Sequence, residues 1–147
     1  MQQDAPMAAV AHAIQLSVAP VFLLSGIAGM LAVMTNRLSR IIDRARLLEA
    51  QLPASPPEAI VHLNAELATL SRRAKLISSS ITFCTATALL VCAVIAVGFS
   101  SAVLVRFDAS VPVSLLFVAG MITFFAGLVL FLREIFIATA NLRIGPH

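Results

Sequence analysis

The stretch TNRLSRIIDRARLLE, residues 35–49, marks a change in the character of the chain. Residues 13–34 before it carry no charged side chain, whereas residues 37–49 contain four arginines and two acids. Apolar residues nevertheless continue at helical spacing through the stretch. It is therefore a candidate catalytic cluster, a candidate patch for a polyanion, or the point at which a helix leaves a membrane.

The composition of the whole chain favours the membrane. Of its 147 residues, 60% are hydrophobic and 12% are charged. A typical soluble domain is about 45–50% apolar and about 25% charged. A soluble chain of this composition would expose large apolar patches, which soluble monomers avoid. We therefore expect one membrane domain over residues 1–147, with lipid as much of its solvent.

Three windows of the sequence are free of Asp, Glu, Lys and Arg. All three are longer than the roughly 20 apolar residues with which a helix crosses a bilayer core. The sequence therefore predicts an all-α integral membrane protein with three transmembrane helices. We expect them at about residues 10–36, 76–105 and 111–133.

The distribution of basic residues predicts the orientation. Seven of them lie between the first two spans: Arg37, Arg40, Arg44, Arg46, Arg72, Arg73 and Lys75. Short segments rich in Lys and Arg mark the cytoplasmic side of a membrane. We therefore expect the N-terminus outside the membrane and the C-terminus on the cytoplasmic side, with a tail along the inner interface at residues 134–147. The formal net charge of +3 then belongs to the inner membrane face, and no nucleic-acid partner is expected.

Two apolar seams continue beyond the first two spans. Their residues are spaced alternately by three and four, and PASPP, residues 53–57, separates them. Such seams, joined by a proline-rich turn, predict a cytoplasmic antiparallel helical hairpin over residues 37–75, paired as in a coiled coil. The seam residues are Leu38, Ile41, Ala45, Leu48 and Leu52 on one arm, and Ile60, Leu63, Leu67, Leu70 and Ala74 on the other.

The base of this hairpin is rich in positive charge. One register brings six basic residues to the same height as a collar: Arg37, Arg40, Arg72, Arg73, Lys75 and Arg133. The collar residues could act only by setting the membrane topology and by extending their charged ends to the interface. Alternatively, they could bind anionic lipid of the inner leaflet. A catalytic role has less support, because no cleft and no partner base are apparent.

Glu134, at the end of the third span, is predicted to reach the arginines of the other helices. We expect an interhelical ion-pair network that fixes how the third span docks. Its predicted members are Arg37, Arg40, Asp43, Arg133 and Glu134.

The second span carries a stripe of small and hydroxyl residues: Ser78, Thr82, Thr85, Cys92 and Ala96. Leu89 interrupts this stripe near mid-span. The third span has a comparable set: Ala119, Gly120, Thr123, Ala126 and Gly127. Small residues allow close helix packing in membranes, and hydroxyls form hydrogen bonds across the contact. The alternative for the stripe of the second span is the lining of a pore in an oligomer.

Motifs for catalysis are missing from the sequence. The three histidines, His12, His62 and His147, lack the spacing of a metal site. There is no glycine-rich phosphate loop, nucleophile elbow or HExxH motif. We therefore expect no catalytic residue, no metal and no cofactor, and predict that the protein is not an enzyme.

Four segments resemble one known family. They are IQLSVAPVFLLSGI (residues 14–27), NRLSRIIDRARLLE (36–49), LSRRAKLI (70–77) and LFLREIFIATANLRI (130–144). Together they are similar to a bacterial membrane-protein family catalogued as domain of unknown function 2721. The resemblance implies a small multi-pass inner-membrane protein, and it implies no activity and no catalytic residue.

The sequence thus predicts a non-enzymatic structural, regulatory or accessory subunit. It would self-associate as a homo-oligomer or dock on a larger membrane complex, and its collar would bind anionic lipid. The alternative is an oligomeric channel for ions or small solutes, lined by the stripe of the second span.

Overall fold

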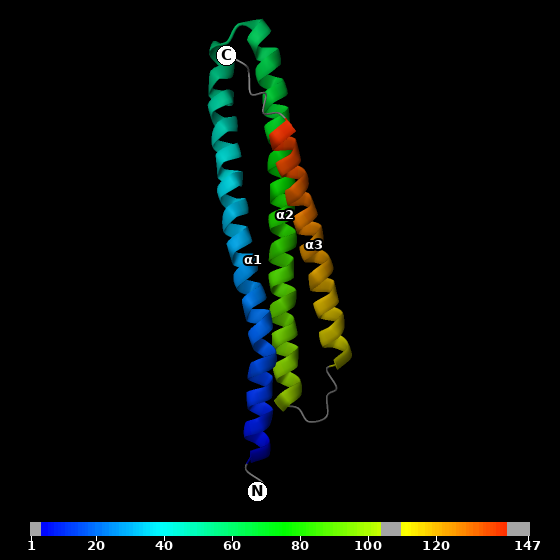
Figure 1. The fold of residues 1–147 in the computed structure, drawn as a ribbon. Coiled ribbons are helices and arrows are strands. Elements are labelled where there is room, and N and C mark those ends of the chain that lie inside the picture. Colours follow the sequence, from blue (N-terminus) through cyan, green and yellow to red (C-terminus); the bar gives the residue numbers. More distant parts are fainter. Residues whose placement is uncertain (1–3, 104–109, 141–147) are drawn as a thin grey trace. The chain divides into compact units, whose positions relative to one another are not determined.

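The computed structural model describes residues 4–103 and 110–140. These residues form α1 (Asp4–Gln51), a short 3-10 helix η1 (Leu52–Ala54), α2 (Pro57–Val103) and α3 (Ser110–Ala140) (Figure 1). Within the described residues the chain is therefore all-helical, as predicted. The predicted end of the second span, residue 105, and the predicted tail beyond residue 140 lie outside the described residues.

Each of the three helices is long and apolar enough to cross a membrane. A bilayer core about 30 Å thick needs about 20 residues of helix. α3 has 31 residues, whereas α1 and α2 have 48 and 47. α1 and α2 are therefore much longer than one crossing requires, and they pass without a break through the predicted span ends at residues 36 and 76.

The connection between α1 and α2 is short and proline-rich. The Ser55 hydroxyl donates to the carbonyl of Gln51 at 2.8 Å, which satisfies one of the free carbonyls at the end of α1. Pro57 is the first residue of α2, where the missing proline N–H has no helical partner to lose. The predicted turn, residues 53–57, overlaps this connection.

Burial recurs every seven residues along all three helices. Seven residues is the repeat of helices that pack knobs into holes. The buried rows are Ile27, Met34, Ile41 and Leu48 on α1; Leu70, Ile77, Cys84 and Val91, and Ser80, Thr87 and Val94, on α2; and Gly120, Gly127 and Glu134 on α3.

The chain divides into two compact units, and each contains part of every helix. The first unit comprises Met1–Met30 and Phe83–Phe125. In it, the hydroxyl oxygens of Thr87 and Thr123 are 3.0 Å apart. A Cβ on Gly120 would lie 3.7 Å from that of Leu90, which is an ordinary van der Waals contact, so α3 packs against α2 at this position.

The second unit comprises Leu31–Thr82 and Ala126–His147. The buried Ser80 hydroxyl of α2 donates to the carbonyl of Gly127 on α3 at 2.6 Å. The same hydroxyl lies 3.5 Å from the sulfur of Met34 on α1. Ser80 therefore stands where the three helices meet, and its hydrogen bond offsets the cost of burying a polar group.

Candidate functional site

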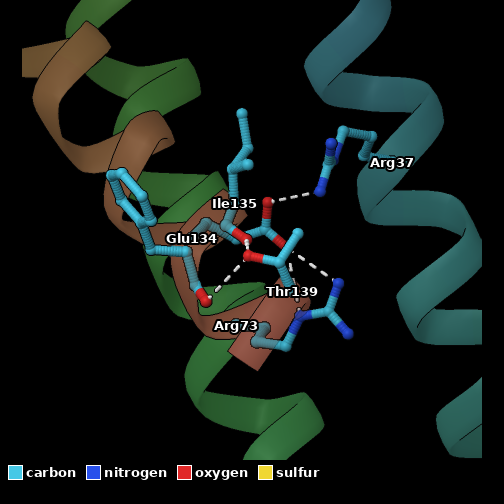
Figure 2. A network of polar contacts seen from close by, with 6 residues as sticks. Arg37, Arg73, Glu134, Ile135 and Thr139 are labelled. Atoms are coloured by element: carbon cyan, nitrogen blue, oxygen red, sulfur yellow. Dashed lines mark hydrogen bonds and ion pairs between the residues drawn. The ribbon is translucent and has the colours of Figure 1, made fainter. Parts of the chain in front are cut away.

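Glu134 is the centre of an ion-pair cluster in the second unit. Its side chain is fully buried and continues the buried row that Gly120 and Gly127 begin on α3. Arg73 of α2 donates to Oε1 of Glu134 from Nε at 3.1 Å and from Nη2 at 2.9 Å. Arg37 of α1 places Nη2 at 2.9 Å from Oε2 (Figure 2). We call this arrangement the Glu134 clamp, because one carboxylate joins all three helices.

The two halves of the clamp differ in geometry. Arg73 makes directed hydrogen bonds, whereas the Arg37 contact is an ion pair at short distance that leaves Oε2 without an aligned donor. The Arg37 guanidinium also lies 5.5 Å from the centre of the Phe131 ring, which is a favourable cation–π distance. A buried carboxylate is tolerated only when it is paired, so both arginines are needed here.

The clamp lies at one end of the apolar part of each helix. Arg37 is the first charged residue after the uncharged stretch of α1, and Glu134 comes two residues after that of α3. Arg73 precedes the uncharged stretch of α2, which begins at residue 76. The ion pairs therefore bring together, within the second unit, the ends of the three apolar stretches.

A second ion pair joins α1 to α2. Arg44 donates to Oε1 of Glu66 from Nε at 3.2 Å and from Nη2 at 3.0 Å. The two side chains are 56% and 33% exposed. An exposed pair of this kind stabilises a fold by at most about 1 kcal/mol. Its significance is positional, because it holds Arg44 beside the pocket described next.

A pocket of about 340 Å³ lies in the second unit, between α1 and α2. Its walls are formed by Arg37, Arg40, Ile41, Arg44, Leu70 and Arg73. Ile41 and Leu70 are buried and form an apolar wall. Among the described residues, no carboxylate pairs with Arg40, although the other three arginines each have one. We call this the arginine pocket.

The six residues of the predicted collar fall into two groups in the structure. Arg37, Arg40 and Arg73 line the arginine pocket. The other three members, Arg72, Lys75 and Arg133, are exposed and do not line it.

The ion-pair cluster differs from the predicted network in its members. Arg37 pairs with Glu134, but the second arginine is Arg73, which is a member of the predicted collar and not of the predicted network. Arg40, Asp43 and Arg133 are exposed, and none pairs with Glu134 in the part of the chain described. Adjacent helical residues point about 100° apart, so Arg133 faces away from the buried row that Glu134 completes.

A signal for Arg73 was present in the sequence. It stands seven residues before Ser80 and fourteen before Thr87, in the row that α2 turns toward α3. The contacts Arg73–Glu134 and Ser80–Gly127 step by seven residues in opposite directions along the two helices.

None of the ten seam residues is exposed. Ile41, Leu48 and Leu70 are buried and the other seven are half-buried. Ile41 and Leu70, which come from opposite arms of the predicted hairpin, line the same pocket. An antiparallel hairpin on the cytoplasmic side stays a prediction.

The predicted stripe of the second span lies on the outer face of the chain. All five members are exposed: Ser78, Thr82, Thr85, Cys92 and Ala96. α2 instead packs through a different polar set, Ser80 and Thr87, which are buried. The stripe is therefore available to lipid or to another chain and takes no part in the core of this one.

Across residues 4–103 and 110–140, no three or more His, Cys, Asp or Glu side chains cluster as metal ligands would. His62 is exposed on α2. The side chain of His12 and the whole of His147 lie outside the described residues.

Three helices of this length and apolarity, joined by a buried carboxylate where their apolar parts end, indicate a membrane protein. The chain belongs to the family described as Protein of unknown function (DUF2721), whose match covers residues 17–144. This confirms the family resemblance, and the matched range includes the Glu134 clamp and the arginine pocket. No curated protein and no solved structure matches the chain.

Proposed function

We propose that this protein is a non-enzymatic structural or accessory subunit of the bacterial inner membrane that binds anionic lipid through its basic collar. The observation that carries the proposal is the excess of positive charge gathered around the Glu134 clamp, where the apolar stretches end. Anionic lipid is the partner that this charge meets at a membrane surface, and each nearby basic residue adds about 1 kcal/mol to the attraction.

The state of the polar groups supports a structural role. Glu134, Ser80 and Thr87 are buried, and their polar contacts run between helices or to the backbone of their own helix. Residues used in this way stabilise packing and are poorly placed to act on a substrate. Arg37 and Arg73 are likewise engaged by Glu134.

Exposed apolar residues support docking to a further chain. Ile42, Leu47 and Val61 are exposed, although they lie beyond the uncharged stretches of α1 and α2. Burial of these side chains against a further chain would be favourable, because it removes apolar surface from water. The predicted hairpin, residues 37–75, is the segment that would present them to a partner or to another copy of the chain.

The test is to release the assembly from native membranes and measure its intact mass. We expect retained anionic lipid together with either further copies or a second protein. A lipid-free monomer, obtained under detergent conditions that keep lipids on other membrane proteins, would contradict the proposal.

The channel remains a second candidate because the stripe of α2 is exposed. In an oligomer, Thr82 and Thr85 could then face a shared pore. Solute or ion flux through reconstituted liposomes that Thr82→Leu and Thr85→Leu abolish, without loss of assembly, would favour this alternative. Flux equal to that of empty liposomes would count against it.

A further inference from the structure

We propose that the arginine pocket binds a single phosphate group, with Arg40 as its principal ligand. The inference deepens the proposed function, on which its placement at the membrane surface rests. In the proposed function, lipid is attracted to the collar as a whole; here the phosphate binds at one site of defined residues. Four observations support it: charge, hydrogen-bond donors, size and depth.

The charges at the pocket do not balance. Four arginines line it, and two carboxylates, Glu66 and Glu134, pair with three of them. The local excess is therefore two positive charges, four less two. A phosphate monoester carries about −1.5 to −2 at neutral pH, which matches this excess.

Free hydrogen-bond donors remain on the lining arginines. A guanidinium has five N–H groups. Arg44 and Arg73 each direct only Nε and Nη2 to a carboxylate oxygen. In the described part of the chain Arg40 has no carboxylate partner at all. Because the planar guanidinium matches two phosphate oxygens at once, Arg40 is suited to a bidentate contact.

The volume and depth suit a headgroup phosphate. A pocket of about 340 Å³ holds a phosphate and a few attached atoms. At about 1.5 Å per residue, Arg40 lies about 5 Å beyond Arg37 along α1. The headgroup layer adds roughly 5–7 Å to each side of the hydrocarbon core. With Arg37 at the edge of that core, Arg40 reaches the level of lipid phosphates.

The phosphate could belong to a lipid or to a soluble compound. The apolar wall of Ile41 and Leu70 would contact the glycerol and first carbons of a lipid. The experiment therefore uses dioctanoyl phosphatidic acid, inorganic phosphate and dioctanoyl phosphatidylcholine as separate probes. The first two offer a phosphate that carries about −1.5 to −2, and the third is the zwitterionic control.

Binding to the full chain in detergent is measured by native mass spectrometry and calorimetry. We expect one phosphatidic acid per chain and competition by inorganic phosphate. We expect much weaker binding of phosphatidylcholine. If inorganic phosphate binds as tightly as phosphatidic acid, the site holds and its ligand is a soluble phosphate; tighter binding of phosphatidic acid assigns it to lipid.

The deciding variants are Arg40→Gln and Arg72→Gln. Both remove one collar charge from an exposed side chain, but only Arg40 lines the pocket. Arg40→Gln should weaken phosphatidic acid binding by roughly tenfold or more, the usual effect of losing a charge-assisted hydrogen bond. Arg72→Gln should leave it nearly unchanged, and both variants should keep the wild-type melting temperature.

The outcomes separate the two proposals. Equal weakening by both variants would overturn the pocket and leave the collar as a diffuse lipid-binding surface. Absence of binding by the wild-type chain to either anionic probe would overturn the pocket alone, because the proposed function is decided by the lipid retained on release from native membranes.

Discussion

At the scale of single residues, Glu134 is the side chain on which the packing most depends. It is the one buried acid among the side chains whose burial the structure describes, and it stands between two arginines from different helices. Glu134→Gln keeps the shape but leaves Arg37 and Arg73 without their anion. Because breaking a buried ion pair is costly, we expect a loss of about 3 kcal/mol in the free energy of unfolding. Denaturant titration of the protein in mixed micelles measures it.

The control for this variant is Glu66→Gln. It removes a carboxylate of the same type from the exposed Arg44–Glu66 pair. We expect a loss of less than about 1 kcal/mol. Equal losses for the two variants would mean that burial of Glu134 does not set the strength of the clamp.

A charge exchange tests which arginine holds Glu134. Glu134→Arg alone should destabilise strongly, because three cations would then meet in one site. Adding Arg73→Glu should recover much of the loss, since the two hydrogen-bonding partners are only exchanged. Adding Arg40→Glu should recover little, because Arg40 makes no ion pair with Glu134. Thermal melting of the three variants decides between the observed clamp and the network predicted from sequence.

At the scale of helices, the buried rows of α2 determine which of its polar residues contribute to the stability of the fold. Ser80 is buried and donates to Gly127, whereas Ser78 is exposed two residues earlier. Ser80→Ala should therefore cost about 1 kcal/mol of stability, the usual net worth of one such hydrogen bond. Ser78→Ala is the matched control and should cost almost nothing. A larger effect at Ser78 than at Ser80 would show that the outer face of α2 contacts another chain.

The sequence predicted the helices well because long apolar windows and a proline-rich turn are local signals. The predicted stripe did not identify the buried face of α2, because a line drawn at 100° per residue drifts away from the seven-residue repeat that the buried residues follow. Extending the seam from Leu70 by sevens would have reached Ile77, Cys84 and Val91, all buried. Arg73 and Ser80 are likewise seven residues apart. Their contacts on α3, however, depend on how α3 is aligned along α2, and no local sequence pattern gives that alignment.

At the scale of the whole molecule, the charge distribution makes a prediction about topology. The basic residues between residues 37 and 75 should hold the connection between α1 and α2 in the cytoplasm. The exposed Ala54 of this connection can be replaced by cysteine as a reporter. Ala54→Cys should react with a membrane-impermeant maleimide in inverted vesicles and remain unlabelled in intact spheroplasts. Native Cys84 and Cys92 are internal controls, because they lie within the uncharged stretch of α2, which is predicted to span the membrane and which a membrane-impermeant reagent does not enter. Labelling of Ala54→Cys from the outer side alone would reverse the predicted orientation and remove the collar from the anionic inner leaflet.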